Sequence, residues 1–299
     1  MIKLSIIMPV FNGLGYTKNC LKKLYELLGN PQLNYHTDII LVDDCSTDGT
    51  KNWVNLNYPD TIILKGNGSL WWSGGINMGM NWALKELKAD YILWWNNDIV
   101  PANDYFKVLE SIFSSNGIET IIGSKIYCYG KDSIIWSMGG KFDPKIGKRY
   151  MEGFMQQDSD SFSTKTEADW LPGMGTIIPA NVINKIGLLD ETNFPQYHGD
   201  SDYTLRAKNQ GIKIKVVPEL KIWNHTGNSG ELHNFEFKGL ISSLTSIKSI
   251  YNIKKDLLFY KKYSSSYIAY LFLLKLYLNY IGGFFKWKIL SYIGIKRKH

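Results

Sequence analysis

Short apolar runs alternate with amphipathic segments over the first hundred residues of the chain. Four runs have the length and composition of buried strands, at residues 4–10, 38–42, 61–64 and 91–95. Between them apolar residues recur at helical spacing, for example at Tyr16, Cys20, Leu24, Leu27 and Leu28. Strands that alternate with helices pair in parallel through right-handed crossovers. The pattern predicts an α/β fold with a mostly parallel central sheet flanked by helices.

The regular alternation ends near residue 130. We expect a strand and turn at 134–140, and a polar loop or mobile flap over 141–168. Strand patterns return at 176–179 and 212–217, with a short helix at 181–186 and a helix from near Asp200 that ends at Gly211. We therefore predict one α/β domain over residues 1–230, followed by a helical extension over 231–299.

The extension carries a strongly apolar and aromatic segment at 267–285, interrupted by Lys275 and followed by a basic tail. A membrane-spanning helix needs about 20 mostly apolar residues, so this segment is at the limit and has a charge near its middle. A basic, aromatic-rich helix that lies on an anionic membrane surface fits the pattern better. The alternative is a C-terminal helix packed on the domain.

Composition excludes a disordered chain, because 44% of the residues are hydrophobic and 20% are charged. The net charge of +7 is compatible with nucleic acid, an anionic membrane or a phosphorylated small molecule as partner. The cysteines, Cys20, Cys45 and Cys128, are sparse and far apart, which indicates a reducing compartment. The first apolar run is too short for a signal peptide. We predict a cytoplasmic protein, peripheral on the inner face of the cell membrane.

Polar side chains follow two of the predicted strands. The fourth strand ends in Asn96-Asn97-Asp98, and the second ends in the sequence VDDCSTDGT. Ligands in open α/β sheets bind beyond the carboxyl ends of strands. Asp98 offers hard oxygen ligands that suit Mg²⁺ or Mn²⁺, and such an ion could hold the phosphates of a nucleotide. The alternative is an Asn/Asp-rich turn without a ligand.

The helix that begins near residue 200 carries two acids of different roles. Asp200 and Asp202 point to different sides of a helix, while Asp202 and Arg206 are spaced to form an ion pair. Asp200 is free to face a cleft, or alternatively serves as the helix N-cap.

These motifs occur in the same order in one known family. The chain resembles the inverting family 2 glycosyltransferases with the GT-A fold, and among them the bacterial rhamnosyl- and galactofuranosyl-type enzymes that make surface polysaccharides. The resemblance covers residues 3–228 and depends mainly on VDDCSTDGT and GDSDYTLRA.

The resemblance implies a role for each group of motif residues. Asp200 would be the general base that deprotonates the acceptor hydroxyl. The nucleotide would contact Pro9, Phe11, Asn12, Asp43 and Asp44, with Asp44 reading the pyrimidine. The donor and its phosphates would contact Trp71, Trp72, Ser73, Gly74, Gly75 and Asn97, and the acceptor would contact Asp169, Trp170 and Gly173.

The metal motif of the family is usually Asp-x-Asp, and this chain departs from it at Asn96. An amide oxygen can still coordinate an ion but carries no charge, so Asp98 becomes the principal ligand of Mn²⁺ or Mg²⁺, with His225 as a second one.

The function that the resemblance implies is transfer of a hexosyl or rhamnosyl group, with inversion, to a lipid-linked oligosaccharide. Deoxythymidine-diphosphate rhamnose and a uridine-diphosphate hexose or galactofuranose are both open as donors, and a homodimer is compatible with the sequence. One alternative is a nucleotide-sugar-binding protein without turnover. The other is a nucleic-acid-binding α/β protein, which no recognised motif supports.

Overall fold

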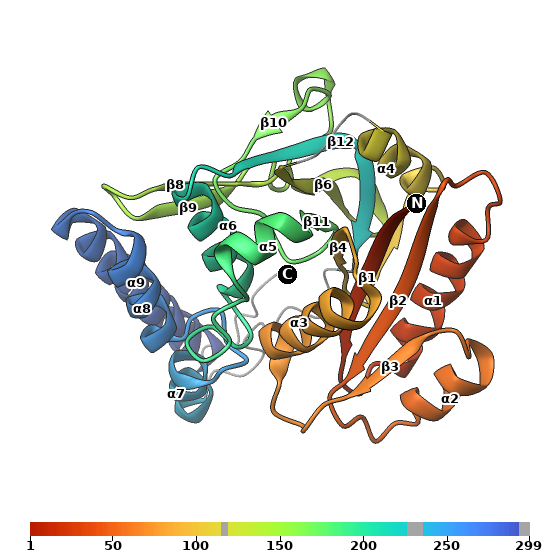
Figure 1. The fold of residues 1–299 in the computed structure, drawn as a ribbon. Helices are drawn as coiled ribbons and strands as arrows, with labels where there is room; N and C mark the ends of the chain where they lie inside the picture. Colours follow the sequence, from red (N-terminus) through yellow and green to blue (C-terminus); the bar gives the residue numbers. More distant parts are fainter. Residues whose placement is uncertain (115–118, 226–235, 293–299) are drawn as a thin grey trace. The chain divides into compact units, whose positions relative to one another are not determined.

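The fold is shown in Figure 1 as a computed structural model, which describes residues 1–114, 119–225 and 236–292. The chain divides into two compact units. Residues 1–141 and 151–227 form the first unit, and residues 142–150 and 228–299 form the second. The boundary predicted between residues 230 and 231 lies outside the described residues.

Within the described residues, the first unit is built on a ten-stranded mixed sheet. Its strands are β1 (Ile2–Val10), β2 (Tyr35–Asp43), β3 (Ile62–Lys65), β4 (Tyr91–Trp94), β5 (Ile99–Pro101), β6 (Thr120–Cys128), β7 (Lys131–Ser137), β10 (Thr166–Glu167), β11 (Thr176–Pro179) and β12 (Lys213–Asn224). Their order is β10-β12-β6-β11-β4-β1-β2-β3, with β5 paired to β12 and β7 paired to β6.

The predicted central sheet flanked by helices is confirmed. β1 pairs in parallel with both β2 and β4, and β2 pairs in parallel with β3. β11 is antiparallel to β4 and β6, which makes the sheet mixed. The sequence pattern did not predict β6, although this strand is buried along most of its length and forms a long parallel pair with β12.

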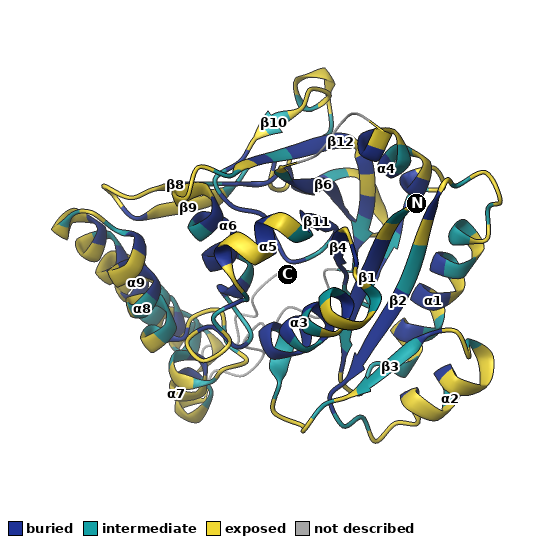
Figure 2. Ribbon diagram, in the orientation of Figure 1, coloured by how far each residue is buried: buried dark blue, intermediate teal, exposed yellow. Residues whose placement is uncertain are grey.

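Helices cover both faces of this sheet, and each face has its own apolar core (Figure 2). The helices are α1 (Leu14–Leu28), α2 (Thr50–Asn57), α3 (Trp71–Trp82), α4 (Tyr105–Ser114), α5 (Ala180–Ile186) and α6 (Gly199–Asn209), with a π-helical turn η1 (Ala83–Leu87) after α3. Leu4, Ile6 and Met8 of β1 pack in the core of α1, α2 and α4. Ile7 packs with α3, α5 and α6, as expected because successive side chains of a strand point to opposite faces.

The glycines near residue 75 let α3 approach β1 closely. An added Cβ at Gly79 would overlap Ile7 Cγ2, and one at Gly75 would lie 2.8 Å from Pro9 Cβ. Gly75 and Gly79 are four residues apart and so lie on one face of the helix. The glycine-rich segment over 66–75 is a loop only up to Leu70, and its second half is the start of α3.

The polar segment 141–168 is not the loop or mobile flap that the sequence predicts. It contains the strands β8 (Gly140–Asp143) and β9 (Lys148–Met151), a short helical turn η2 (Asp160–Phe162) and β10. In the first unit, Asp158 accepts hydrogen bonds of 2.6 Å from Lys125 Nζ and from Tyr127 Oη. Burial opposes ionisation of Asp158, but these bonds outweigh it and lower the pKa of the carboxyl. Because Lys125 is buried, this pairing fixes the segment to β6.

The second unit consists of the β8–β9 hairpin tip and the helices α7 (Phe237–Thr245), α8 (Ile253–Tyr263) and α9 (Tyr267–Tyr292). Tyr260 Oη donates to Gly147 O at 2.7 Å, so α8 holds the tip. One face of α9 is buried, through Ala269, Leu273, Tyr277 and Phe284. Among the described residues, α9 is also the one helix with the length and composition to cross a membrane, which by itself is weak support for a spanning segment.

Gly79→Ala tests the close approach of α3 to β1. We expect the variant to unfold at a free energy about 1–3 kcal/mol lower than the wild type, because the new methyl group must displace Ile7 in a packed core. Gly15→Ala is the matched control. Its Cβ meets nothing within 4 Å on α1, so it should be neutral or slightly stabilising. Urea unfolding followed by circular dichroism measures both, and equal midpoints for the two variants would contradict the close contact.

Candidate functional site

The site residues gather at the carboxyl ends of three neighbouring parallel strands. Val10 of β1 pairs with Asp43 of β2, and Ile7 pairs with Trp94 of β4. The segments after these strands therefore emerge side by side at one edge of the sheet. They carry Phe11, Asp44 and Asn96, as the sequence predicts.

Asp44 is buried and organises the loop before α3. Its carboxylate accepts from the backbone N–H groups of Gly68 at 2.6 Å, Leu70 at 2.9 Å and Trp71 at 3.3 Å. An added Cβ at Gly66 would lie 2.5 Å from Asp44 Oδ1, so only glycine leaves room for this arrangement. A carboxylate has about four acceptor positions. Asp44 thus holds the loop with three of them, a role that the sequence does not reveal, and keeps one position for a ligand.

The turn after β1 is hydrogen-bonded to the turn after β2. Asn12 has a left-handed backbone, with φ of 49°, and its Oδ1 accepts from Thr47 N at 2.8 Å. Asp43 Oδ1 accepts from Ser46 N at 2.9 Å. Asp43 also lines a cavity of about 400 Å³ together with polar residues and two lysines, namely Cys45, Ser46, Thr47, Gly49, Lys51, Asn52 and Lys65. Beside this network, the ring of Phe11 is 58% exposed and available to stack on a base.

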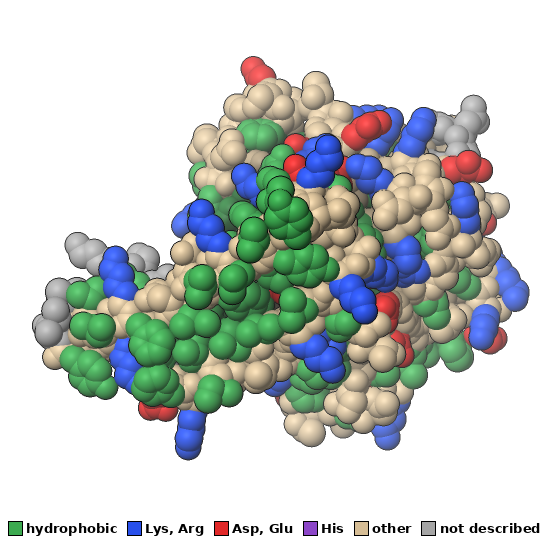
Figure 3. Space-filling model, turned by 90° about the vertical axis from the view of Figure 1, so that its left-hand side faces the viewer, with side chains coloured by type: hydrophobic (Ala, Val, Ile, Leu, Met, Phe, Trp, Pro, Cys, Tyr) green, Lys and Arg blue, Asp and Glu red, His purple; other side chains and the backbone are tan. Residues whose placement is uncertain are grey.

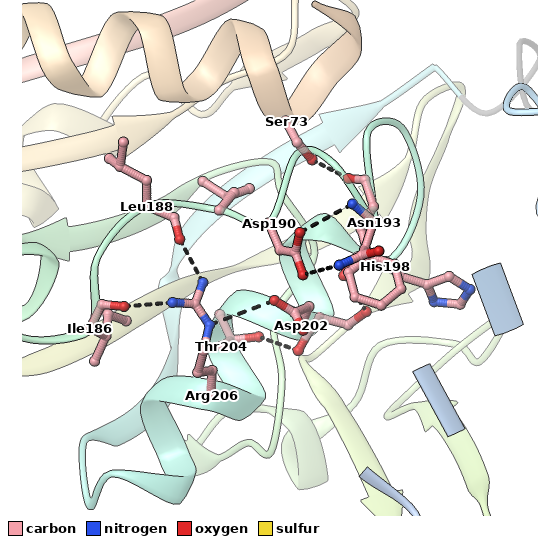
Figure 4. Close-up of polar contacts among 12 residues, drawn as sticks. Ser73, Ile186, Leu188, Asp190, Asn193, His198, Asp202, Thr204 and Arg206 are labelled. Atoms are coloured by element: carbon pink, nitrogen blue, oxygen red, sulfur yellow. Dashed lines mark hydrogen bonds and ion pairs between the residues drawn. The ribbon is translucent and has the colours of Figure 1, made fainter. Parts of the chain in front are cut away.

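Polar groups in the first turn of α3 form hydrogen bonds to other parts of the protein. Ser73 N donates to Pro195 O at 2.8 Å and Ser73 Oγ donates to Phe194 O at 2.6 Å, a contact drawn in Figure 4. Gly74 N donates to Leu70 O within the helix, and Gly75 packs on Pro9. The Ser73 and Gly74 amides therefore donate within the protein, and the donor contact expected at 73–75 stays a prediction.

The three polar residues after β4 have three different environments. Asn96 Oδ1 accepts from Trp72 Nε1 at 3.0 Å, so its oxygen is engaged by an indole. Asn97 Nδ2 donates to Gly13 O at 3.3 Å and to Thr17 Oγ1 at 3.0 Å, which fixes the start of α1. Asp98 Oδ1 is buried and has no hydrogen-bond partner. Among these side chains, Asp98 is the one with a buried acceptor left for a ligand.

His225 is brought to Asp98 by strand pairing. β5, which follows Asp98, pairs with the end of β12, and His225 N donates to Asp98 O at 3.1 Å. The His225 ring stacks on Tyr129 at 3.6 Å between centroids and meets Tyr16 edge-on at 5.6 Å. Burial raises the pKa of Asp98, and the neighbouring His225 opposes that shift.

Asp98 and His225 fit a divalent cation. A buried carboxylate oxygen without a partner is costly unless a charge or a donor meets it, and carboxylate and imidazole are ordinary ligands of Mn²⁺. No group of three or more His, Cys, Asp or Glu that could hold a metal occurs among the described residues. The remaining coordination positions would therefore belong to ligand oxygens and water.

Asp200 lies in the first turn of α6 and is half-buried. The N-cap position is His198, with a left-handed φ of 67°, so Asp200 is not the N-cap that the sequence left open. Its Oδ2 accepts from Gly173 N at 2.9 Å and its Oδ1 from Ser201 N at 2.7 Å.

Asp202 has the structural role that its spacing predicts. It is fully buried, and Arg206 Nε lies 3.6 Å from its Oδ2. Arg206 also donates to the carbonyl oxygens of Ile186 and Leu188, as Figure 4 shows. The pair fixes α6 against the segment after α5.

The residues expected to meet an acceptor are largely inside the protein. Trp170 is 7% exposed, its ring lies against Gly140, and its Nε1 donates to Lys141 O at 3.3 Å. Asp169 pairs with Lys208. Trp170 therefore packs instead of offering a platform for a sugar, and Gly173 is the member of this group in contact with Asp200.

Trp72 contacts both the segment after β4 and the segment that hydrogen-bonds Asp200. Its indole N–H meets Asn96 after β4, and its six-membered ring lies against Gly173, whose own N–H meets Asp200. The sequence predicted Trp72 only as a donor-side aromatic residue. It did not reveal this link or the stacking of Tyr129 on His225, because both depend on contacts between segments far apart in the chain.

Comparison with known proteins identifies the family. Residues 5–170 match the model of glycosyl transferase family 2. An uncharacterized glycosyltransferase of Rickettsia typhi is 27% identical over 197 residues, which are 63% of this chain and 54% of that protein. A poly(ribitol-phosphate) beta-N-acetylglucosaminyltransferase, TarS of Staphylococcus aureus, is 32% identical over 98 residues, which are 33% of this chain and 16% of that protein. The chain spans about half the length of the first of these relatives.

Solved structures share the fold. Crystal structures of S. aureus TarS residues 1–349, alone and with UDP-GlcNAc, align with TM-scores of 0.53 and 0.54 at 17% identity. They cover 75% and 77% of this chain and 60% of the TarS chain in each case. At this identity the likeness shows the fold, which is the GT-A fold expected from the sequence, with helices on both faces of the central sheet. The match over residues 5–170 assigns the chain to glycosyl transferase family 2.

Proposed function

We propose that the chain transfers a sugar, with inversion, from a nucleoside-diphosphate donor to a hydroxyl group of a lipid-linked oligosaccharide in surface-polysaccharide synthesis. The observation that carries this proposal is a pair of carboxylates whose neighbours contact Trp72. Asp98, two residues after the Asn96 that accepts from the indole, has a buried oxygen without a hydrogen-bond partner and lies beside His225. Asp200 is half-buried and accepts from Gly173, against which the indole ring lies. One carboxylate fits a cation that binds diphosphate, and the other fits a proton acceptor.

The nucleoside end of the donor would bind where β1 and β2 end. Phe11 stacks on the base, Asp44 offers its remaining acceptor position to a base N–H, and Pro9, Asn12 and Asp43 line the pocket. A uridine or deoxythymidine base has such an N–H. The TarS structure solved with UDP-GlcNAc favours a uridine-diphosphate sugar for this chain, while a deoxythymidine-diphosphate rhamnose remains the second donor to test.

The diphosphate end would lie beside Asp98 and His225, which would hold Mn²⁺ or Mg²⁺. When bound, the ion neutralises negative charge on the diphosphate leaving group. Asn96 is hydrogen-bonded to Trp72, and Asn97 is hydrogen-bonded to Thr17 at the start of α1. These two residues therefore fix the segment that carries Asp98.

Asp200 would accept the proton of the acceptor hydroxyl. The hydroxyl oxygen then bonds to the anomeric carbon as the bond from that carbon to the diphosphate oxygen breaks, and the electron pair leaves with the diphosphate. Attack from the face opposite the leaving group inverts the anomeric centre. The N–H groups of Gly173 and Ser201 orient the carboxylate.

The second unit would hold the protein on the membrane that carries the acceptor. Seven exposed side chains of α9 lie along one stripe at spacings of three, four or seven residues, and Ile268, Tyr270 and Leu276 are exposed outside it. The stripe consists of Tyr267, Leu271, Leu274, Leu278, Phe285, Ile289 and Tyr292. The face drawn in Figure 3 shows apolar side chains with interspersed basic ones. Between residues 253 and 299 the only acid is Asp256, whereas lysines recur. An apolar stripe with basic flanks is typical of a helix that lies on an anionic bilayer.

The buried face of α9 favours this flat orientation over a spanning one. Tyr277 Oη donates to Asp256 Oδ2 of α8 at 2.6 Å, and the rings of Tyr251 and Tyr280 stack at 3.9 Å. A helix that crossed the membrane would lose the Tyr277–Asp256 hydrogen bond and the Tyr251–Tyr280 stacking from the middle of its length.

Asp200→Asn tests the proton acceptor. We expect kcat to fall by about 10²–10⁴-fold, because an amide does not take up the proton, while the dissociation constant for UDP with Mn²⁺ stays within about twofold. Mass-spectrometric detection of the glycosylated product and calorimetric UDP titration measure the two quantities. Asp202→Asn is the contrasting variant, for which a lower melting temperature is expected. Loss of UDP binding in Asp200→Asn would reassign Asp200 to structure.

Asp98→Asn tests the cation site. We expect Mn²⁺ to bind about 10–100-fold more weakly in the presence of UDP, because a charged ligand becomes a neutral one. Calorimetric titration with Mn²⁺ gives the affinity. Asp104→Asn, at an exposed acid shortly after β5, should leave it unchanged. Equal affinities for the wild type and Asp98→Asn would remove Asp98 from the proposal.

Replacing Leu271, Leu274 and Leu278 together by Gln tests the membrane stripe. We expect at least about tenfold less binding to vesicles that contain phosphatidylglycerol, since three exposed apolar side chains are lost from the contact. Sedimentation with vesicles measures the bound fraction. Leu56→Gln, at a residue of α2 that is 83% exposed, is the control. Retention of the triple variant on vesicles, or resistance of the wild type to carbonate extraction from cell membranes, would contradict a peripheral helix.

The engaged oxygen of Asn96 favours one second candidate, a protein that binds nucleotide sugar without turnover. The wild-type protein with Mn²⁺ and a panel of nucleotide sugars separates the two. Transfer or slow hydrolysis of a donor supports the transferase, and tight binding with no product supports the binding protein.

A further inference from the structure

Trp72 makes contacts with three segments that are distant in the sequence. Its backbone N–H donates to Gln196 Oε1 at 3.2 Å, which joins the start of α3 to the segment before α6. Its indole Nε1 donates to Asn96 Oδ1 at 3.0 Å, and its ring meets Trp94 edge-on with 5.5 Å between centroids.

The contact with Gly173 is the tightest of these. An added Cβ at Gly173 would overlap Cζ2 and Cη2 of the Trp72 indole. Gly173 does not have a positive φ, so its backbone does not require glycine. The need for glycine here comes from the indole alone. The Trp72 ring therefore fixes the position of the peptide whose N–H donates to Asp200 Oδ2 at 2.9 Å.

The indole N–H also engages residue 96, where the chain departs from the acidic metal motif. The amide oxygen of Asn96 accepts from it, while Oδ1 of Asp98 stays without a hydrogen-bond partner. Trp72 thus contacts both Asn96, two residues before Asp98, and Gly173, whose N–H donates to Asp200.

We propose that Trp72 is a positioning residue for the transfer reaction: it holds Asn96 with its indole N–H and, through ring contact with Gly173, sets the orientation of Asp200. This inference depends on the proposed function, because it assigns a task in the same site. Trp72 acts on the alignment of base and donor and not on the affinity for the nucleoside, which binds at the ends of β1 and β2.

The experiment is a second-site rescue. In Gly173→Ala, the methyl group displaces the indole or the 172–173 peptide, and we expect kcat to fall by about 100-fold, the loss typical of a misplacement of about 1 Å. Trp72→Phe removes Cζ2 and Cη2 together with the indole N–H, and we expect a loss of about tenfold. The double variant has room for the methyl group, so its kcat should exceed that of Gly173→Ala by about tenfold or more.

Controls separate positioning from folding. Trp82→Phe is the same substitution on the same helix, at a residue outside these contacts, and it should neither reduce kcat nor rescue Gly173→Ala. All variants should bind UDP with Mn²⁺ within about twofold of the wild type and keep its circular dichroism spectrum. The donor for kcat is the nucleotide sugar that the wild type turns over most rapidly in the panel.

Each outcome bears on the inference. Rescue by Trp72→Phe but not by Trp82→Phe, with unchanged UDP affinity, supports it. Normal kcat in Gly173→Ala, absence of rescue, or parallel loss of UDP affinity and kcat overturns it while the proposed function stands. A wild type that turns over no donor overturns the proposed function, and the positioning task with it.

Discussion

The close approach of α3 to β1 is the constraint on which the site depends. Gly75 and Gly79 allow the helix backbone to lie directly on Pro9 and Ile7. A side chain at either position would push the helix outward by the width of a methyl group, and a packed interior does not absorb such a change without strain. The first turn of α3 would move with it, and that turn carries Trp72. The two glycines thus set the position of Trp72 by fixing the distance between α3 and β1, and Gly79 does so without contacting a ligand.

Two aspartates at the same edge of the sheet show how environment separates the roles of identical groups. Asp44 accepts three backbone N–H groups and stabilises the loop before α3. Asp98 leaves a buried oxygen without a partner, and burial raises the pKa of its carboxyl. A carboxylate satisfied by the protein contributes to folding, whereas one left unsatisfied is a cost that a bound cation removes. The sequence alone ranks both residues as ligands.

The two units present surfaces of different chemistry. The first unit presents polar groups at strand ends, which suit a phosphorylated and hydroxylated ligand. The second presents an apolar stripe on α9 with lysines around it, while Tyr277 and Tyr280 on the inner side are held by α8 and by Tyr251. A helix with an exposed apolar stripe gains free energy at an interface between water and lipid.

The sequence by itself determined the order of strands and helices up to β4, the helices α6 and α9, and the candidate residues at strand ends. These follow from local periodicity and from polar residues that end apolar runs, which depend on neighbours within a few positions. The Asp202–Arg206 pair was predictable for the same reason, since its partners are one helical turn apart.

Only the tertiary structure decided what each candidate residue does. Asp44 meets amides more than twenty residues away, Trp170 is covered by Gly140, and Asn96 is engaged by Trp72. The segment 141–168 looks like a flap in sequence, yet Lys125 and Tyr127 hold Asp158. Each of these contacts joins segments distant along the chain, so no local pattern records it. The role of a buried polar group depends on which partner lies next to it in the folded protein.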